Sequence, residues 1–437
     1  MSTLSIGARV AMLCAAALLG LTAAVPAQPQ RFPTAVQTDL GGVSLISESD
    51  DDETVAGVQV FLAAGLDRQL PSESGIAALV ADCITRTPVN GVAVRDAIAQ
   101  SGGSLDFTVE GRSVHFYIES VPQMLPAQVE LFAKALSAPD FSPQTIAAAR
   151  SALTARINDL EGNALSVAVE MFRRSYFATS AGLPALGSTT AIATLSSKDL
   201  AAFYQANYRR SGLSASAAGD LTPGLADALK TLAAGLPEGV VTPVVPKAKP
   251  IPENAPRIVS NRDVAAPIVV VGYAAPPPGS ADFGAMLVLE SLLSNAFERS
   301  SATTLGIAER SVGAFYLYDS SPASLVVYVN GTRVDPSIAL RELLVAAKSL
   351  SLKPLDAEAL KHFKIVAEGQ FLTGSLMVAD RAYLLGTFAA QGLGSDAINA
   401  ALAALDKTTA ADVQRVAKTY LQRYIVALVL PRQNGGS

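Results

Sequence analysis

The sequence predicts an α/β chain made of two halves with a similar plan. Segments with strand patterning alternate with segments of helical spacing, and both halves repeat one order of elements. Residues 237–256 separate the halves and contain six prolines. Proline fixes φ and lacks an N–H donor, so this segment is expected to be an extended linker. We therefore predict an N-terminal domain over residues 28–236 and a C-terminal domain over residues 257–437.

Residues 1–27 have the pattern of a secretory signal peptide. Arg9 is their only charge, the run 10–25 is almost wholly apolar, and Ala27 supplies a small residue at the cut. A membrane anchor is the alternative, but the apolar core is short and no basic cluster follows it. After cleavage only Cys83 remains, so no intrachain disulfide is expected. Export without disulfides favours a bacterial periplasm, with no membrane contact after cleavage.

The composition excludes some functional classes. Half of the residues are hydrophobic and 16% are charged, which is typical of a chain with large cores and excludes a disordered protein. The 33 Lys and Arg residues are outnumbered by 38 Asp and Glu residues, and no basic stripe occurs, so no nucleic-acid partner is expected. Cys83 lies among Leu79, Val80 and Ile84, which favours a small buried hydrophobe over a reactive thiol.

The N-terminal half is expected to begin with two strands and two helices. The second helix ends at Gly102-Gly103, a natural helix stop. A later helix has an apolar stripe at helical spacing, from Ile146 to Leu160. In chain order, we predict strands over 43–48 and 57–63, a helix from Gly75, a helix over 92–100, a strand pair over 105–118 and a helix over 142–160.

The C-terminal half is expected to follow the same order. We predict a strand over 267–274, a helix over 281–297, strands over 314–318 and 323–330, and then a long helical run. Both halves also close alike. Ser196 and Thr409 each stand three residues before an acid, a pattern typical of a helix N-cap. The predicted helices end near Tyr208 and Tyr420, and the strands 212–218 and 424–430 follow them.

An acidic run, residues 48–53, separates the first two strands. Calcium binding is one interpretation, but the run lacks the glycine and the spacing of an EF-hand loop, which favours a solvated hairpin.

Several motifs, taken in order, resemble the pitrilysin/insulinase family of zinc peptidases. Phe61-Leu-Ala-Ala-Gly-Leu-Asp67 and Gly75-Ile-Ala-Ala-Leu-Val-Ala-Asp82-Cys83 resemble the strand, acidic turn and helix that carry the family's inverted zinc motif. Ser101-Gly-Gly-Ser-Leu-Asp-Phe107 resembles the start of the family's Gly-Gly-x-Leu-Asn-Ala strand. A third similar stretch contains Pro184-Ala-Leu-Gly187, Ile192, Leu195, Asp199-Leu200, Phe203-Tyr204, Tyr208 and Gly219-Asp220. The resemblance implies two homologous α/β (α+β) domains of mixed sheet flanked by helices, similar to mitochondrial processing peptidase.

The resemblance also implies that the zinc chemistry is lost. The family's two histidines fall on Ala78 and Asp82, and its catalytic glutamate falls on Ala81. Its third ligand falls on Arg156, and the upstream glutamate on Ala149. A cation cannot ligate zinc, so no catalytic residue, metal ligand or cofactor is expected in this chain. An ion pair between Asp82 and Arg156 across the vacated site is a possible replacement.

Two further features bear on catalysis. The chain has two histidines, His115 and His362, which we interpret as ordinary packed or surface residues. Active members carry Arg-x6-Tyr in the C-terminal half, and the alignment places Ala308 and Phe315 there. The resemblance implies that this pair faces the scissile bond of the substrate. A loop shift would replace it by Arg310 and Tyr316 as substrate-binding residues, whereas the simpler interpretation is a surface arginine and a strand aromatic.

The function implied is that of a non-catalytic, peptide-binding subunit. Family members of this size pair with a second chain, so a zinc-bearing subunit and an unfolded peptide are the expected partners. The peptide is expected to dock on the edge strand formed by Leu105, Asp106, Phe107, Thr108 and Val109. Alternatives are a stand-alone peptide-binding homodimer and a purely structural subunit. A hydrolase with an unrelated nucleophile is disfavoured, because no Gly-x-Ser-x-Gly elbow occurs.

Overall fold

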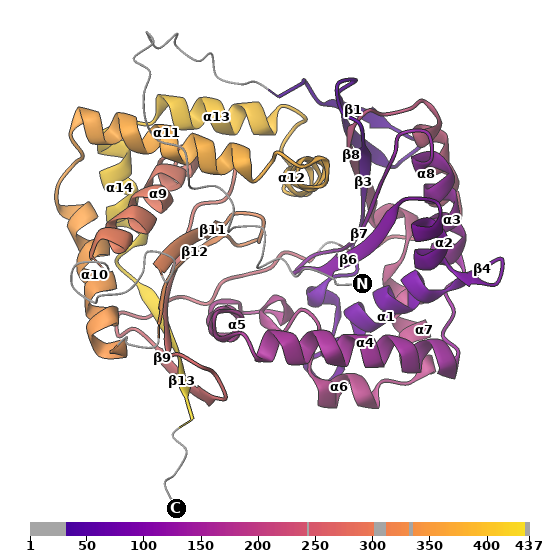
Figure 1. Cartoon of the computed structure of the whole chain (residues 1–437), viewed down its shortest axis with the longest axis horizontal. Coiled ribbons are helices and arrows are strands. Elements are labelled where there is room, and N and C mark those ends of the chain that lie inside the picture. The colour runs from indigo at the N-terminus through magenta and orange to yellow at the C-terminus, as the bar shows by residue number, and fades with distance from the viewer. Residues whose placement is uncertain (1–31, 243, 301–311, 332–334, 433–437) are drawn as a thin grey trace, which may run out of the picture. The chain divides into compact units, whose positions relative to one another are not determined.

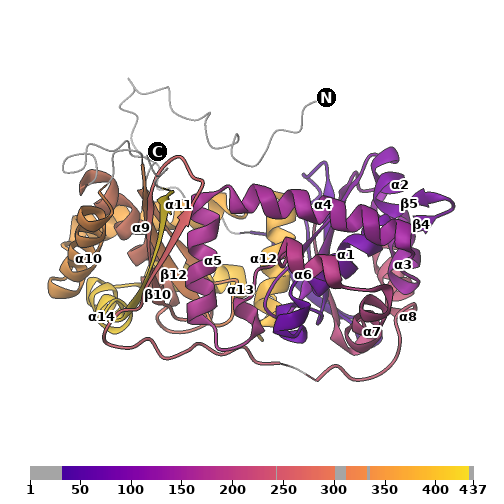
Figure 2. The ribbon, with the colours of Figure 1, turned by 90° about the horizontal axis from the view of Figure 1, so that it is seen from below.

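The computed structural model describes residues 32–242, 244–300, 312–331 and 335–432, with the backbone alone for 296–300. The predicted leader lies outside these residues. The described chain folds into two sheets flanked by helices, which confirms the predicted α/β class (Figures 1 and 2). No helix within the described part has the length and apolar character needed to span a membrane.

The first sheet has six strands in the order β1-β2-β8-β3-β7-β6. Strands β2 and β8 run parallel, and every other pair in the sheet is antiparallel. The strands are β1 (Val36–Asp39), β2 (Ser44–Ser49), β3 (Ala56–Leu62), β6 (Ser104–Val109), β7 (Val114–Ser120) and β8 (Leu213–Gly219). The helices of this region are α1 (Ile76–Arg86), α2 (Val94–Gln100), α3 (Leu125–Ser137), α4 (Pro143–Glu161), α5 (Ala164–Tyr176), α6 (Thr189–Thr194), α7 (Ser197–Asn207) and α8 (Gly224–Ala234), with a small hairpin of β4 (Pro88–Val89) and β5 (Val92–Ala93).

The second sheet repeats this order. Its five strands follow β11-β12-β10-β13-β9, as β6-β7-β3-β8-β2 do in the first sheet, and the β13–β9 pair is again parallel. The predicted internal repeat is therefore present in the sheet topology. The strands are β9 (Arg257–Arg262), β10 (Ile268–Ala274), β11 (Val312–Leu317), β12 (Ser324–Asn330) and β13 (Tyr424–Pro431). The helices are α9 (Phe283–Ser300), α10 (Pro336–Leu352), α11 (Ala357–Thr373), α12 (Val378–Ala390), α13 (Ala397–Lys407) and α14 (Ala410–Tyr420).

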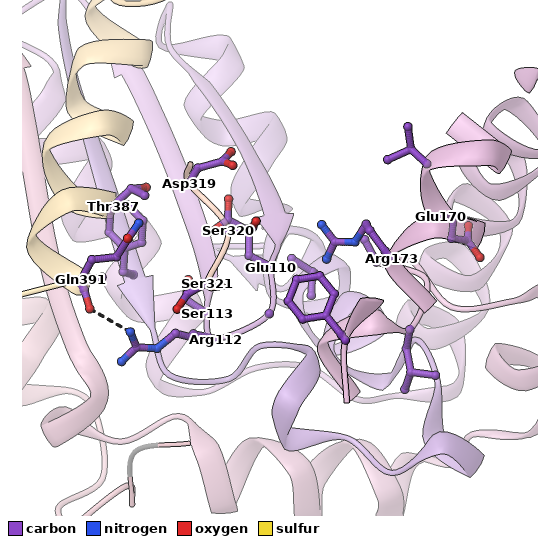
Figure 3. Close-up of a pocket in the computed structure, with 18 of the residues that line it drawn as sticks. Glu110, Arg112, Ser113, Glu170, Arg173, Asp319, Ser320, Ser321, Thr387 and Gln391 are labelled. Atoms are coloured by element: carbon purple, nitrogen blue, oxygen red, sulfur yellow. Dashed lines mark hydrogen bonds between the residues drawn. The ribbon is translucent and has the colours of Figure 1, made fainter. Parts of the chain in front are cut away.

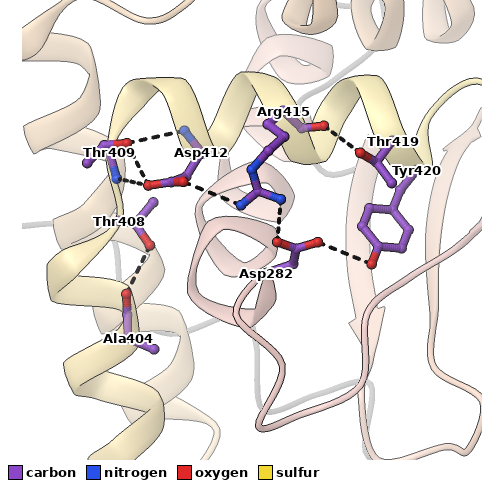
Figure 4. Close-up of polar contacts among 8 residues, drawn as sticks. All are labelled: Asp282, Ala404, Thr408, Thr409, Asp412, Arg415, Thr419 and Tyr420. Atoms are coloured by element: carbon purple, nitrogen blue, oxygen red, sulfur yellow. Dashed lines mark hydrogen bonds and ion pairs between the residues drawn. The ribbon is translucent and has the colours of Figure 1, made fainter.

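The helix caps predicted from the sequence are present. The Ser196 side chain accepts from the Asp199 N–H at the start of α7, and Asp199 accepts from the Ser196 N–H in return. Thr409 and Asp412 form the same capping box at α14 (Figure 4). The first N–H groups of a helix have no acceptor within the helix. Each capping box provides acceptors for two such N–H groups and so fixes where the helix begins.

Two helices cross between the halves. Helix α5 belongs to the N-terminal half in sequence but packs on β10 and β13, and α12 of the C-terminal half packs on β3 and β8 (Figure 1). Glycines permit both contacts. A Cβ added at Gly272 would lie 2.2 Å from the ring of Phe172, and one at Gly386 would lie 2.1 Å from the ring of Phe61.

The acidic run is not fully solvated, and the predicted hairpin is wrong, because β8 lies between β2 and β3 in the sheet. Arg381 of α12 is buried, and its Nε lies 3.0 Å from Oε1 of Glu48, which is 1% exposed. The Arg381 guanidinium also lies 2.6 Å from Glu53. Sequence reasoning missed this cluster because Arg381 lies more than 300 residues away along the chain. Ser49, Asp51 and Asp52 are exposed as expected.

Candidate functional site

The positions of the family's zinc site are closed by packing. Ala78 and Ala81 on α1 and Ala149 on α4 are completely buried, in the core between these two helices. Two methyl groups therefore occupy the places where a metal ligand and a catalytic base are expected. Within the described residues, no three His, Cys, Asp or Glu side chains gather as a metal site would require. The residues present do not fit zinc, because alanine offers no donor and arginine is a cation.

Asp82 and Arg156 have separate partners. The Asp82 carboxylate is 2% exposed and lies 2.6 Å from Arg86 Nε and 3.5 Å from a terminal nitrogen of Arg95. The Arg156 guanidinium lies 5.2 Å from the centre of the Phe107 ring and 4.0 Å from Asp106. The suggested Asp82–Arg156 pair is therefore wrong. Arg86, one turn further along α1, is the nearer cation for Asp82.

Both histidines are ordinary structural residues. His115 lies in β7 between the rings of Phe61 and Tyr383, 5.2 and 5.1 Å away. Burial lowers the pKa of His115 to about 4, so the imidazole is neutral near pH 7. His362 is exposed on α11, 5.0 Å from the ring of Phe363.

The predicted docking strand, Leu105 to Val109, lies in β6 at the edge of the first sheet. Among the described strands it pairs only with β7. The Glu110 N–H donates to the Ser113 carbonyl, so alternation places the free N–H and C=O groups on Leu105, Phe107 and Val109. These groups are available to an added strand. The side chains of the same three residues point into the core.

One group on this edge is already engaged. The Phe107 N–H donates to its neighbour Asp106 Oδ1 at 2.8 Å. Asp106 is exposed and the bond is local, so a peptide carbonyl can displace it. The Phe107 ring itself is 2% exposed and packs against Phe116, so it does not project into a groove as an apolar anchor.

The corresponding edge of the second sheet is closed. The Ala314 and Tyr316 N–H groups of β11 donate to Ser294 Oγ at 3.1 Å and to Glu290 Oε1 at 2.8 Å, both from α9. The Tyr316 side chain is 4% exposed, and its hydroxyl donates to the Pro276 carbonyl. Tyr316 is thus a core residue, contrary to the proposed substrate contact. Arg310 lies outside the described residues.

A cavity of about 250 Å³ opens where β6 ends (Figure 3). Val109 and Glu110 line one wall, and Arg173 of α5, Asp319 of the β11–β12 connection and Thr387 of α12 line others. Sequence reasoning missed these residues. No motif marks them, because the walls come from segments more than 200 residues apart.

Comparison with known families and structures gives one consistent result. The profile of Insulinase (Peptidase family M16) matches residues 44–188, and that of the Peptidase M16 inactive domain matches residues 194–362. The comparison with curated proteins gave no match.

Three similar crystal structures show the fold. A protease from Helicobacter pylori has a TM-score of 0.81 at 17% identity, over 92% of this chain and 100% of that one. A peptidase M16 inactive domain from Pseudomonas fluorescens has a TM-score of 0.78 at 13% identity, over 92% and 100%. A putative M16-like peptidase from Alicyclobacillus acidocaldarius has a TM-score of 0.74 at 15% identity, over 91% and 98%. With the two profiles covering more than half of the sequence, this chain belongs to the M16, or pitrilysin/insulinase, peptidase family, as a homologue without the zinc motif.

Proposed function

We propose that this protein is the non-catalytic, peptide-binding subunit of a periplasmic zinc metallopeptidase pair. The observation that carries the proposal is an open strand edge beside metal-site positions that have lost their donors. The first sheet keeps β6 free for strand addition, whereas alanines replace the ligand and base at Ala78 and Ala81. A zinc-bearing M16 subunit supplies the chemistry, and this chain holds the unfolded peptide.

The partner is tested by tagging the protein in its native host. We expect gel filtration and mass spectrometry to recover a second chain with an intact His-x-x-Glu-His motif. Peptide cleavage is expected from the mixture and not from this chain alone. N-terminal sequencing of the exported chain checks the cleavage after residue 27. A homodimer in an extract with no zinc-bearing family member overturns the pairing and favours a stand-alone peptide-binding or structural protein.

Peptide docking on β6 is tested by a proline at Phe107. The Phe107 N–H faces away from β7, so Phe107→Pro removes a donor from the free edge without removing a ladder bond. The loss of the Phe107 ring also destabilises the core, and therefore Phe107→Leu is the matched control for packing. We expect Phe107→Pro to weaken binding of an extended peptide about tenfold relative to Phe107→Leu. Equal affinities in the two folded variants mean that β6 does not take peptide.

A further inference from the structure

The cavity of Figure 3 lies in the path of a peptide bound to β6. Val109 is the last residue of β6, Glu110 follows it, and both line the cavity. Antiparallel pairing is the more stable and more common mode of strand addition. A peptide added in that direction has its amino end beside Val109. The side chains in the cavity therefore lie beside the first residues of such a peptide.

Two carboxylates in this cavity share one hydroxyl. The Tyr383 hydroxyl contacts Glu110 Oε1 and lies 3.0 Å from Asp319 Oδ2. A phenol has a single proton, so it donates to only one carboxylate at a time. Within the described part of the chain, neither Glu110 nor Asp319 has a lysine or arginine within ion-pair distance. The pair is short of donors.

The nearby cations are held elsewhere. Arg173 donates to the Ala181 carbonyl at 3.0 Å, and its guanidinium lies 5.4 Å from the centre of the Phe177 ring. Arg112 donates to the Ala390 carbonyl at 3.1 Å. Burial and then the charge of Asp319 raise the pKa of Glu110 to about 7, although the Tyr383 hydrogen bond and Arg173 oppose the rise. Glu110 and Asp319 thus share the electrostatic influence of Arg173 but have no direct ion pair with it, which favours a cationic donor between the two carboxylates.

A third acceptor belongs to the same cavity. Thr387 of α12 lines it and is 4% exposed, and its Oγ1 makes no hydrogen bond of normal geometry within the described chain, although it lies close enough to the Tyr383 hydroxyl to oppose the rise in that group's pKa. Figure 3 shows Thr387, Asp319 and Glu110 around the cavity, each from a different segment. A buried hydroxyl without a well-formed hydrogen bond is costly, which indicates that a bound group completes the site.

We propose that this cavity binds a primary ammonium group of an extended peptide held on β6. An ammonium carries three N–H donors, and Glu110, Asp319 and Thr387 offer three acceptors. Charge-assisted hydrogen bonds in a half-enclosed cavity are stronger than neutral ones, so the site selects for the charge. The ammonium comes from the peptide's amino terminus or from a lysine side chain. This inference rests on the proposed peptide binding.

Three forms of one probe test the site. The probe is the strand-forming peptide Ala-Thr-Val-Thr-Val-Thr-Ala amide, with a free amino end, with an N-acetyl group, or N-acetylated with lysine as its first residue. Calorimetry is expected to show that N-acetylation weakens binding at least tenfold at pH 7, where most free α-amino groups (pKa about 7.7–8.0) are protonated. If the N-acetylated lysine peptide regains the affinity of the free peptide, the cavity binds a lysine side chain. If it does not, the cavity binds the amino terminus.

Matched variants locate the effect. In the double variant Glu110→Gln, Asp319→Asn, we expect most of the difference in affinity between the free and the N-acetylated peptide to be lost. Glu170→Gln is the control, because Glu170 lines the same cavity but pairs with Arg174 at 2.8 Å. The single variants Glu110→Gln and Asp319→Asn are each expected to lose part of this effect, so the test survives if the double variant does not fold. Equal binding of free and acetylated peptide overturns the site.

A small probe separates this inference from the proposed function. Saturation-transfer NMR compares n-butylammonium with n-butanol on the wild type and on the double variant. If no peptide binds but n-butylammonium binds through Glu110 and Asp319, the ammonium site stands and the peptide-docking function falls. If neither probe binds, both fall.

Discussion

At the scale of single residues, the former metal site has become part of the core. Ala78, Ala81 and Ala149, the positions that the resemblance assigns to the zinc site, are fully buried members of one hydrophobic core, and the helices α1 and α4 that carry them pack on each other. The buried Asp82 carboxylate is paired with Arg86 of α1 and Arg95 of α2, whose side chains are a quarter to a third exposed. A histidine at Ala78 has to displace core atoms, so restoring the motif costs stability before it recruits a metal.

A double-mutant cycle tests whether Asp82 and Arg156 are independent. Asp82→Ala removes the partner of two arginines that are each about a quarter to a third exposed, so we expect a cost of about 1–2 kcal/mol. Arg156→Ala removes a side chain that is 42% exposed and whose ion pair with Asp106 is at the 4.0 Å limit, so it costs about 1 kcal/mol or less. Urea unfolding is expected to give additive effects within about 0.5 kcal/mol. A coupling above about 1 kcal/mol means that the two side chains interact directly.

At the scale of elements, a glycine fixes the start of α1 against its neighbour. Gly75 is the N-cap of α1 with φ of +97°, and an added Cβ would lie 2.6 Å from Ile192 and 2.7 Å from the Leu186 carbonyl. Both the dihedral and the space exclude a side chain. The chain around 186–192 is thereby held against the helix that carries the vacated site.

Gly75→Ala is therefore expected to destabilise the protein by about 2–4 kcal/mol. Gly91 is the matched control, because its φ is +84° but an added Cβ meets nothing within 4 Å. Gly91→Ala adds backbone strain alone, at about 1 kcal/mol. Thermal unfolding of the two variants measures the difference. Equal losses in the two variants contradict the role of close packing at Gly75.

The elements that the sequence predicts well are those with local causes. The capping boxes at Ser196 and Thr409 fix helix starts, and the predicted strands locate β6, which alternates, and β10, which is a continuous apolar run, within two residues. Contacts between residues that are distant in the sequence could not be predicted from it. Nothing near Arg381 in the sequence indicates Glu48, and the residues of the cavity come from β6, α5, α12 and the β11–β12 connection. Capping is a property of a few neighbouring residues, whereas a cavity exists only after distant elements pack.

At the scale of the whole molecule, the two sheets are joined by exchanged helices and by a buried ion pair. Helix α12 packs on β3 and β8 and delivers Arg381 to Glu48, while α5 packs on β10 and β13. Removing α12 would expose apolar surface of the first sheet and leave Glu48 without its cation. The two halves are therefore expected to unfold as one cooperative unit rather than one after the other.

Buried carboxyls make the stability of this unit depend on pH. Burial is the main cause that raises the pKa of Glu48, Glu110 and Glu290, each to about 7. An unfolded glutamate titrates near 4.3, so between about pH 5 and 7 the folded chain binds more protons than the unfolded chain. Stability then falls as pH rises through this window. Below about pH 6.5 the unfolded chain protonates His115, whereas the folded chain keeps it neutral because its pKa is lowered. This difference of at most one proton opposes the fall in stability.

We therefore expect the free energy of unfolding to decrease by roughly 2 kcal/mol per pH unit between pH 5 and 7, because three glutamates bind extra protons and His115 opposes them by at most one. Urea unfolding at pH 5, 6, 7 and 8 measures this slope. Glu290→Gln tests one contribution, because the amide oxygen still accepts from the Tyr316 N–H but carries no charge. This variant is expected to match the wild type at pH 5 and to exceed its stability at pH 8. A stability that rises from pH 5 to 8 in the wild type, or a variant weaker than the wild type at pH 8, contradicts the electrostatic cost assigned to these buried acids.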